Sequence, residues 1–368
     1  MDIEYDHELA NNDIEYKMGL SPIDNNINNI LEEPPIAYNP QSFESEVIIH
    51  FLQNQKLLKN IQYCSVCGNA MNMCKKGDAI DRLVWRCHKR KPAHDIKINI
   101  RKDSIFEAFQ IKIQILYFLL FFCFSENVGI NKAYEKCKSF CDQLGETAVT
   151  PASITKFFSL VRDKIRIKMH KILEKELLGI EINPEFGYPA VEIDESKIIS
   201  SGEEIYWMFW AIDRNTKDAR IWCVLKDRTK DRLLPFVKKY INTDRGDQED
   251  EIHSIRTRVF SDSFSSYQVS DFSNLGFILK RINHSVWFGT GYLHSNTIES
   301  LWHQIKSINN NFTGLSVVKL KLMFNNDENM IINYLDGWIC YSLFLREINR
   351  KKLNWIGIIN YLSNYLII

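Results

Sequence analysis

The chain has 368 residues, 45% of them hydrophobic and 25% charged, which excludes a collagen-like or fully disordered protein. This length can bury one sizeable core, or two domains and a small module. The 46 basic and 46 acidic residues cancel. This balance does not exclude a nucleic-acid partner, because acidic residues gather at the N-terminal end and basic residues lie further along. Residues 1–20 are acidic and have no apolar run, so no signal peptide is expected.

The first two regions differ in composition. Residues 1–46 are rich in Asp, Glu and Asn and are expected to form an acidic, disordered tail. A short amphipathic helix is predicted within Phe43–Leu58. It leads into a Cys-rich, basic module, and the helix and module together make up the second region, residues 47–103.

The Cys-rich module has the spacing of a metal site. Nine cysteines in a chain with no export signal are expected to stay reduced, and some of them to bind metal. "CSVCGNAM" contains a C-x2-C knuckle in which Gly68 relieves the turn, and "LVWRCHKRKPAH" supplies a third cysteine and two histidines downstream. The spacing predicts a structural Zn2+ held by three cysteines and one histidine. The predicted ligands are Cys64, Cys67, Cys87 and His94.

The fourth zinc ligand stays open on the residues alone, because a second C-x2-C pair is absent. His88 is the alternative to His94, and Cys74 is a weaker competitor. The same cysteines could instead be buried as apolar residues. The module also carries basic side chains that either contact phosphates or are merely solvated; they are Arg86, Lys89, Arg90, Lys91, Lys97, Arg101 and Lys102.

The third region, residues 104–183, is expected to be helical. Its most apolar run, Ile113–Phe124, is about a dozen residues long, below the roughly 20 that span a bilayer, so we expect a buried helix and no membrane partner. Thr150 as N-cap and Pro151 at the first position predict the start of a second helix. A preceding helix and Gly145 between the two helices indicate a helix-turn-helix-like DNA-binding region. Alternatively, the basic face of the second helix is only solvated. That face carries Arg162, Lys164, Arg166, Lys168 and Lys171.

The fourth region, residues 184–350, changes to short β-rich runs, and residues 351–368 form a C-terminal segment. Three strands are predicted in "PAVEIDESKI", "EIYWMFWAID" and "RIWCVLKDR", followed by alternating helices and strands. This order predicts an α/β domain in which helices cover a mixed sheet.

Three acids occupy strand ends or a helix start in this region: Asp194, Asp262 and Glu299. Acids delivered in this way can converge on one sheet edge and hold two Mg2+ ions, which prefer carboxylate oxygens. Each acid has an alternative. Asp194 suits a turn and Asp262 suits a helix cap, while Glu299 lies three residues after Asn296, as in a capping box. Lys306 follows Glu299 by almost two helical turns, so both side chains project from the same helix face. There Lys306 would either clamp a phosphate or form a surface salt bridge.

These blocks together resemble the Merlin transposases and their insertion-sequence relatives. The resemblance is carried by "VEIDESKI", "FWAIDRNTKDARIWCVLKDRTKDRLLPFVKKYI", "VFSDSFSSY", "INHSVWF" and "HSNTIESLWHQIKS", and it runs from about Cys64 to Arg346. It implies an RNase H-like DDE catalytic domain, with Asp194, Asp262 and Glu299 as the metal-binding triad and Lys306 as the lysine that follows. It also implies histidines that contact phosphate at His284 and His294, which as isolated residues could equally be structural.

The chain departs from the family pattern at two points. His94 stands where the last cysteine of the ribbon usually stands, which supports His94 as ligand and leaves the fourth position in doubt. The acidic loop "GDQEDEIHSIR" precedes the third strand block, either as a plain insertion or as acid near the path of DNA.

The function implied by the resemblance is DNA transposition. It would need two Mg2+ or Mn2+ ions, a structural Zn2+, and double-stranded DNA with terminal inverted repeats and a target. A homodimer or larger assembly is expected because two ends must meet. The location would be the nucleus in a eukaryotic host, and the cytoplasm or nucleoid otherwise. The alternatives are a domesticated DNA-binding protein and a nuclease of the same fold without strand transfer.

Overall fold

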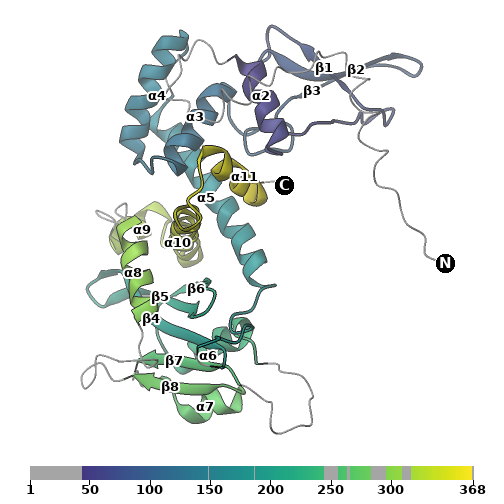
Figure 1. Cartoon of the computed structure of the whole chain (residues 1–368). Coiled ribbons are helices and arrows are strands. Elements are labelled where there is room, and N and C mark those ends of the chain that lie inside the picture. The colour runs from purple at the N-terminus through teal and green to yellow at the C-terminus, as the bar shows by residue number, and fades with distance from the viewer. Residues whose placement is uncertain are drawn as a thin grey trace, which may run out of the picture.

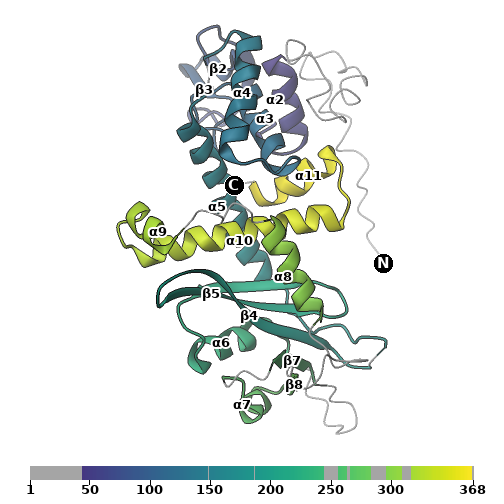
Figure 2. The same cartoon turned by 90° about the vertical axis from the view of Figure 1, so that its left-hand side faces the viewer.

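The computed structural model describes residues 44–147, 149–185, 187–243, 256–262, 266–282, 296–308 and 316–366. The predicted acidic tail therefore lies outside the described residues, apart from its last three positions. Figures 1 and 2 show an N-terminal lobe of helices and a small sheet, and a second lobe built on a larger sheet. The long helix α5 (Pro151–Leu173) leads from the first lobe to the second.

The small sheet forms the Cys-rich module. Its strands pair antiparallel in the order β1-β2-β3, and β2 lies in the centre. Helix α2 precedes the sheet and confirms the amphipathic helix, with its apolar side buried. The bounds are α2 (Ser45–Asn54), β1 (Asn72–Lys75), β2 (Leu83–Arg90) and β3 (Ala93–Asn99).

Three helices follow, as the composition predicts. Helix α3 (Ile113–Phe124) is buried at all 12 positions, which confirms the prediction of a core helix. None of the described helices is both long and apolar enough to cross a membrane. Helix α4 (Ile130–Leu144) ends at Gly145 in the left-handed conformation. Helix α5 begins as predicted, because the Thr150 side chain accepts a hydrogen bond from the Ser153 N–H.

A buried ion pair joins the small sheet to α3. Arg101 and Asp81 are each 1% exposed at the side chain and form two contacts of 2.5 Å. Asp81 also accepts a hydrogen bond from the first N–H of α3, at Ile113. The sequence places Arg101 among the basic residues that either contact phosphate or are solvated. The structure corrects this, because its guanidinium is buried against a carboxylate.

The large sheet has five strands in the order β6-β5-β4-β7-β8. The first three are antiparallel neighbours, whereas β7 pairs parallel with both β4 and β8. Numbered within the domain, this is the order 3-2-1-4-5, with three antiparallel strands followed by two parallel ones. This arrangement is that of an RNase H-like mixed sheet, and it confirms the predicted fold class. The bounds are β4 (Ala190–Ser201), β5 (Glu204–Asp213), β6 (Ala219–Leu225), β7 (Arg258–Asp262) and β8 (Ile278–Ile282).

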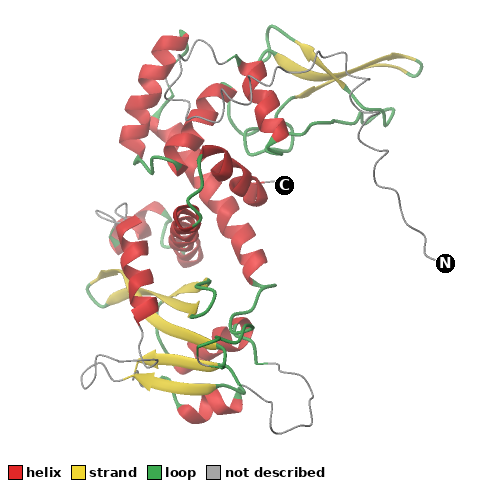
Figure 3. Ribbon diagram, in the orientation of Figure 1, coloured by secondary structure: helices red, strands yellow, loops and turns green. Residues whose placement is uncertain are grey.

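Helices flank this sheet on both sides (Figure 3). Helix α8 packs against β4 and β5, while α6 contacts β6 and α7 contacts β8. The strand β5 coincides with the predicted run "EIYWMFWAID". The helix bounds are α6 (Lys230–Tyr240), α7 (Val269–Asn274) and α8 (Asn296–Ile308).

The C-terminal helices connect the two lobes. Helix α9 (Val317–Met323) leads to α10 (Glu328–Arg350), which lies between the large sheet and the N-terminal helices (Figure 2). Helix α10 contacts α5 and crosses it at a large angle (Figures 1 and 2). Helix α11 (Trp355–Leu366) returns to the N-terminal lobe, where the Trp355 indole donates to the Tyr117 hydroxyl at 2.7 Å. The segment predicted as residues 351–368 thus packs on the helical region. The domain boundaries themselves remain a prediction.

A candidate carboxylate site and a candidate metal centre

The sheet brings Asp194 and Asp262 to the same level on adjacent strands. In the parallel pair β4–β7, Val191 lies opposite Val259 and Glu192 lies opposite Phe260. Two residues further along each strand stand Asp194 and Asp262. Because side chains alternate along a strand, equal steps from a paired position leave both carboxylates on the same face of the sheet.

Helix α8 lies against this face and carries Glu299. The Trp302 indole N–H donates to Oδ2 of Asp194 at 2.8 Å, and the ring of Trp302 packs edge-on against Trp210, with centroids 4.7 Å apart. Glu299 is exposed and lies three residues before Trp302, which places both side chains on neighbouring parts of one helix face. The structure thus brings the helix position of Glu299 next to Asp194.

Electrostatics supports this proximity. The pKa of Asp194 is raised to about 6, chiefly by burial and, to a smaller extent, by the negative charges of Asp262 and Glu299. The hydrogen bonds from Trp302 and from the backbone N–H of Glu195 act in the opposite direction. Carboxylates that raise one another's pKa disfavour charge at the site unless a cation is present. The three acids are of the type that Mg2+ prefers. They do not form a group of ligand atoms within 4.8 Å of one another among the described residues, so their binding of Mg2+ remains a prediction.

A fourth acid, Glu195, lies beside this group and has one incompletely satisfied oxygen. Its side chain is buried, and its Oε1 atom has no hydrogen-bond partner in the described part of the chain. Burial, followed by the charges of Asp194 and Asp262, raises its pKa to about 8, while Arg228, at 3.9 Å from Oε2, lowers it.

The residues that fix α8 were missed from the sequence. Glu192 is 0% exposed; its Oε2 accepts from the backbone N–H of Ile298 in the first turn of α8, at 2.9 Å. Its Oε1 accepts from Nε of Arg214 at 2.7 Å, and the Arg214 guanidinium stacks on the ring of Phe260, 3.6 Å from its centroid. A buried carboxylate that alternates with apolar residues looks like a solvent-facing position in the sequence. Alternation of apolar and acidic residues does predict solvent exposure of the acids when one face of the sheet is open. Here α8 covers that face, so Glu192 is buried.

Four other predictions cannot be placed. His284, His294 and the acidic loop, apart from its last residue Arg256, lie outside the described residues. Lys306 lies in the last turns of α8, but its side chain is not among those described. The roles expected for these groups remain predictions.

The Cys-rich module brings four predicted ligands together. The atoms Sγ of Cys64, Cys67 and Cys87 and Nε2 of His94 all lie within 4.8 Å of one another. His94 Nε2 is 3.5 Å from Cys64 Sγ and 3.3 Å from Cys87 Sγ, and the Sγ atoms of Cys67 and Cys87 are 3.6 Å apart. Tetrahedral zinc bonds of about 2.3 Å to sulfur and about 2.0 Å to nitrogen imply separations of about 3.5 to 3.8 Å. The arrangement is therefore compatible with a zinc ribbon.

Local structure explains why His94 joins the group. His94 Nδ1 donates to the carbonyl oxygen of Pro92 at 2.8 Å, which leaves the lone pair of Nε2 available to a metal. His88, on the neighbouring strand, is exposed and is not a member of the group. Cys74 lies on β1 and is not a member either. Zinc binding itself remains a prediction.

The thiols of this group differ in their affinity for protons. Burial raises the pKa of Cys64, but hydrogen bonds from the backbone N–H groups of Val66 and Cys67 outweigh it and lower the pKa to about 7. At Cys87, burial and then hydrogen bonds with the two other thiols raise the pKa to about 11. Backbone donors therefore favour thiolate at the knuckle, the form that binds metal.

A second group of ligand-type side chains joins α5 to α10. Its members are His170, Asp336 and Cys340. His170 Nε2 and Asp336 Oδ2 are 2.7 Å apart, closer than the roughly 3.3 Å implied for two such ligands on one zinc ion. Arg166 lies 3.9 Å from the same carboxylate oxygen. These distances fit a hydrogen-bonded pair that holds the two helices together.

Comparisons with known proteins returned structures only. No protein-family model and no curated protein matches the chain. Among solved structures, the HTLV-2 integrase catalytic core domain in complex with magnesium matches with 13% identity and a TM-score of 0.25, over 42% of this chain and 82% of that chain. A chain of the simian T-cell lymphotropic virus intasome in complex with the PP2A regulatory subunit B56 gamma matches with 13% identity and a TM-score of 0.22, over 48% of this chain and 60% of that chain.

Proposed function

We propose that this protein is a DDE-type DNA transposase of the Merlin type. The observation that carries the proposal is the approach of Asp194, Asp262 and the helix of Glu299 on one face of an RNase H-like sheet. The shared register of β4 and β7 and the bond from Trp302 to Asp194 support this approach. The motifs that resemble Merlin transposases cover the same elements.

In this proposal Asp194, Asp262 and Glu299 hold Mg2+, which prefers carboxylate oxygens. A cation there would offset the negative charges of Asp262 and Glu299 that help to raise the pKa of Asp194. The bound ions would supply activation of the attacking oxygen and stabilisation of charge on the phosphate. Trp302 and the backbone N–H of Glu195 orient Asp194, because each donates to one of its oxygens. Glu192 fixes the start of α8 and thereby the position of Glu299.

The reaction has two balanced steps. In cleavage, a water oxygen bonds to the phosphorus at the end of the element, the bond to the 3′ oxygen breaks, and a 3′-hydroxyl and a 5′-phosphate are released. In strand transfer, the 3′-hydroxyl oxygen bonds to a target phosphorus, and the 3′ oxygen of the target leaves and takes up the proton. One phosphodiester replaces another, so no external energy source is needed.

The N-terminal regions would recognise DNA. The ribbon and the helices of residues 104–183 are proposed to bind the terminal inverted repeats, with exposed basic side chains on phosphates. Because two ends must be joined, the active form is proposed to be a homodimer or larger assembly.

The test is an excision assay. A donor plasmid carries a marker between the sequences that flank the gene, and Mg2+-dependent nicking and strand transfer are measured for the wild-type chain and for Asp262→Asn. We expect at least about a 100-fold loss of cleavage in the variant, the scale of losing one essential electrostatic contribution to a transition state. Asp271→Asn, an acid of α7, is the matched control and should cleave normally.

The outcomes separate the alternatives. Cleavage at the wild-type rate in Asp262→Asn would remove the basis of the proposal. Cleavage without strand transfer would favour a nuclease of the same fold. A footprint on the flanking sequences with no nicking would favour a domesticated DNA-binding protein.

A further inference from the structure

A cavity of about 180 Å3 opens where α3, α4, α5 and α10 meet, away from the carboxylate site and the ribbon. It contains a cation that the preceding sections do not use, Arg162 of α5, which is only 6% exposed. The sequence pattern places this arginine on the outer basic face of α5. The structure corrects that placement, because α10 covers the position. The lining residues are Cys123, Asn127, Val128, Gly129, Ile130, Phe158, Arg162, Tyr334, Trp338 and Tyr341.

Arg162 has no carboxylate partner in the described part of the chain. Its guanidinium stacks on the indole of Trp338, 4.0 Å from the ring centroid, and one N–H group, on Nη2, donates to Ser159 Oγ at 3.1 Å. Stacking occupies the face of the guanidinium and leaves the N–H groups on its edge available, since arginine has five of them in one plane. Burial lowers the pKa of Arg162, while the thiol of Cys123 and the phenols of Tyr334 and Tyr341 act in the opposite direction and raise it.

The N-terminus of α4 supplies a second positive feature, because Gly129 and Ile130 line the same cavity. Helix α4, which is 15 residues long, begins at Ile130, and its N-cap residue Gly129 provides no side-chain hydrogen bond. The first N–H groups of a helix have no intrahelical acceptor, and the helix dipole adds a partial positive charge there. Gly129 is exposed and Val128 half-buried, so the cavity is open to solvent at this end. The acid nearest in the chain, Glu126, is paired with Lys136 at 2.7 Å.

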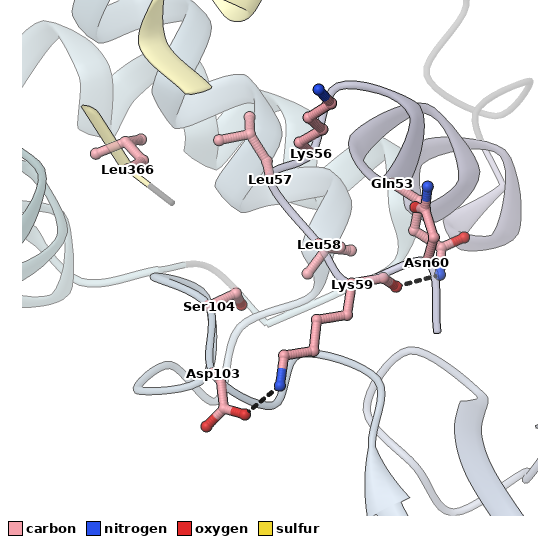
Figure 4. Close-up of a pocket in the computed structure, with 9 residues that line it drawn as sticks. All are labelled: Gln53, Lys56, Leu57, Leu58, Lys59, Asn60, Asp103, Ser104 and Leu366. Atoms are coloured by element: carbon pink, nitrogen blue, oxygen red, sulfur yellow. Dashed lines mark hydrogen bonds and ion pairs between the residues drawn. The ribbon is translucent and has the colours of Figure 1, made fainter. Parts of the chain in front are cut away.

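Two other cavities in the described part of the chain differ in the burial and pairing of their cations. In the cavity of about 260 Å3 beside α2, Lys59 reaches Asp103 at 2.5 Å (Figure 4). In the cavity of about 440 Å3 beside α6, Lys230 is paired with Asp271 at 2.5 Å. Lys59 and Lys230 are thus each paired with a carboxylate, and the other lysines of these cavities, Lys56 and Lys238, are exposed to solvent. Arg162 is instead buried, and burying its charge without a carboxylate is costly unless an anion arrives from outside.

We propose that the Arg162 cavity is a binding site for a phosphate-type oxyanion, held between the edge of the Arg162 guanidinium and the N-terminus of α4. In the described part of the chain, Arg162 has no carboxylate partner and the N-terminus of α4 has no side-chain cap. A guanidinium beside a helix N-terminus is the usual chemistry of phosphate recognition. The cavity volume of about 180 Å3 limits the size of the ligand that fits. Sites for drug-sized ligands occupy about 300–1,000 Å3, so a cavity of this size takes a phosphate group and not a whole nucleotide. The group comes either from free phosphate or from a DNA backbone.

The first arm of the test uses inorganic phosphate. Binding to the full-length, zinc-loaded chain is measured by titration calorimetry and by thermal unfolding, against sodium chloride at equal ionic strength. Phosphate should bind and raise the unfolding temperature, because a ligand that binds only the folded state stabilises it. Arg162→Met should weaken binding by roughly tenfold or more, as expected for loss of a charge-assisted bond. Lys164→Met removes a cation of the same helix outside the cavity and should bind as the wild type.

A second variant, Gly129→Asp, keeps the test valid if Arg162→Met does not fold. Gly129 has φ −69° and ψ 164°, a conformation open to any residue, so Gly129→Asp should fold normally and cap α4 with its own carboxylate. It should keep or raise the unfolding temperature while abolishing phosphate binding. No binding of phosphate beyond chloride, or wild-type binding in both Arg162→Met and Gly129→Asp, would overturn the proposal.

The second arm identifies the source of the phosphate. A short DNA duplex is titrated onto the same variants, with and without inorganic phosphate as competitor. Weaker duplex binding in Gly129→Asp, together with competition by phosphate, would assign the site to the DNA backbone. Unchanged duplex binding beside lost phosphate binding would assign it to free phosphate. This site does not depend on the proposed transposase activity, since neither arm measures cleavage.

Discussion

The ribbon and the carboxylate site solve the same problem, gathering metal ligands, in opposite ways. In the ribbon, three thiols and an imidazole already lie within 4.8 Å of one another. Asp194, Asp262 and Glu299 do not form such a group among the described residues, although they are close enough for their charges to raise the pKa of Asp194.

Charge explains the difference. Thiols and imidazole can be neutral, so a β-hairpin and a tight knuckle can press them together before a metal binds. Carboxylates at neutral pH repel one another and converge fully only around a cation. The ribbon is expected to depend on its metal for folding for a separate reason, which is that zinc binds the folded ligand set and not the unfolded chain. The carboxylate site is held by hydrogen bonds between α8 and β4, and it is expected to need metal for chemistry only.

The largest expected effect is on the ribbon. Cys87→Ser should reduce zinc from one ion per chain to none and unfold the module, because structural zinc contributes about 10–16 kcal/mol to folding in isolated finger peptides. Zinc content and circular dichroism are the measurements. Cys74→Ser is the matched control and should keep its zinc. His94→Ala should lose zinc and His88→Ala should not; the reverse result would move the fourth ligand to His88.

The next effect concerns the buried acid beneath α8. Glu192→Ala leaves Arg214 buried without its carboxylate and removes the acceptor of the Ile298 N–H. We expect a loss of about 3–5 kcal/mol in the free energy of unfolding, measured by urea denaturation. Glu203→Ala, an exposed acid in the turn between β4 and β5, should change stability little. A loss at Glu192 no larger than at Glu203 would show that the pair does not anchor α8.

The smallest effect concerns the orientation of Asp194. Trp302→Phe keeps an aromatic ring against Trp210 but removes the hydrogen bond to Oδ2 of Asp194. A hydrogen bond to a charged group contributes about 1.5–3 kcal/mol of stabilisation. Without it, we expect the Mg2+ concentration needed for half-maximal cleavage to rise roughly tenfold. The Mg2+ dependence of the cleavage rate measures it, with Trp207→Phe as control. An unchanged Mg2+ dependence would mean that Trp302 only packs.

Local sequence patterns predict the helices and strands, whereas the burial of individual charged side chains depends on tertiary packing. The alternation of "EIYWMFWAID" predicts β5, and the Thr150–Pro151 pair predicts the start of α5. By contrast, Arg101 and Arg162 read as surface cations in the sequence and are both buried. Their burial depends on distant partners, Asp81 for one and α10 for the other. No short-range pattern encodes such contacts, which is also why the role of Glu192 was missed.

The central claim is that Asp194, Asp262 and Glu299 share metal ions, and a crystal of the full-length protein soaked in Mn2+ tests it most directly. Anomalous diffraction should place manganese between Asp194 and Asp262, with carboxylate oxygens at about 2.1–2.2 Å. Soaked crystals of Asp262→Asn should lack that peak. Manganese bound only elsewhere, with the three side chains pointing apart in both crystals, would contradict the account.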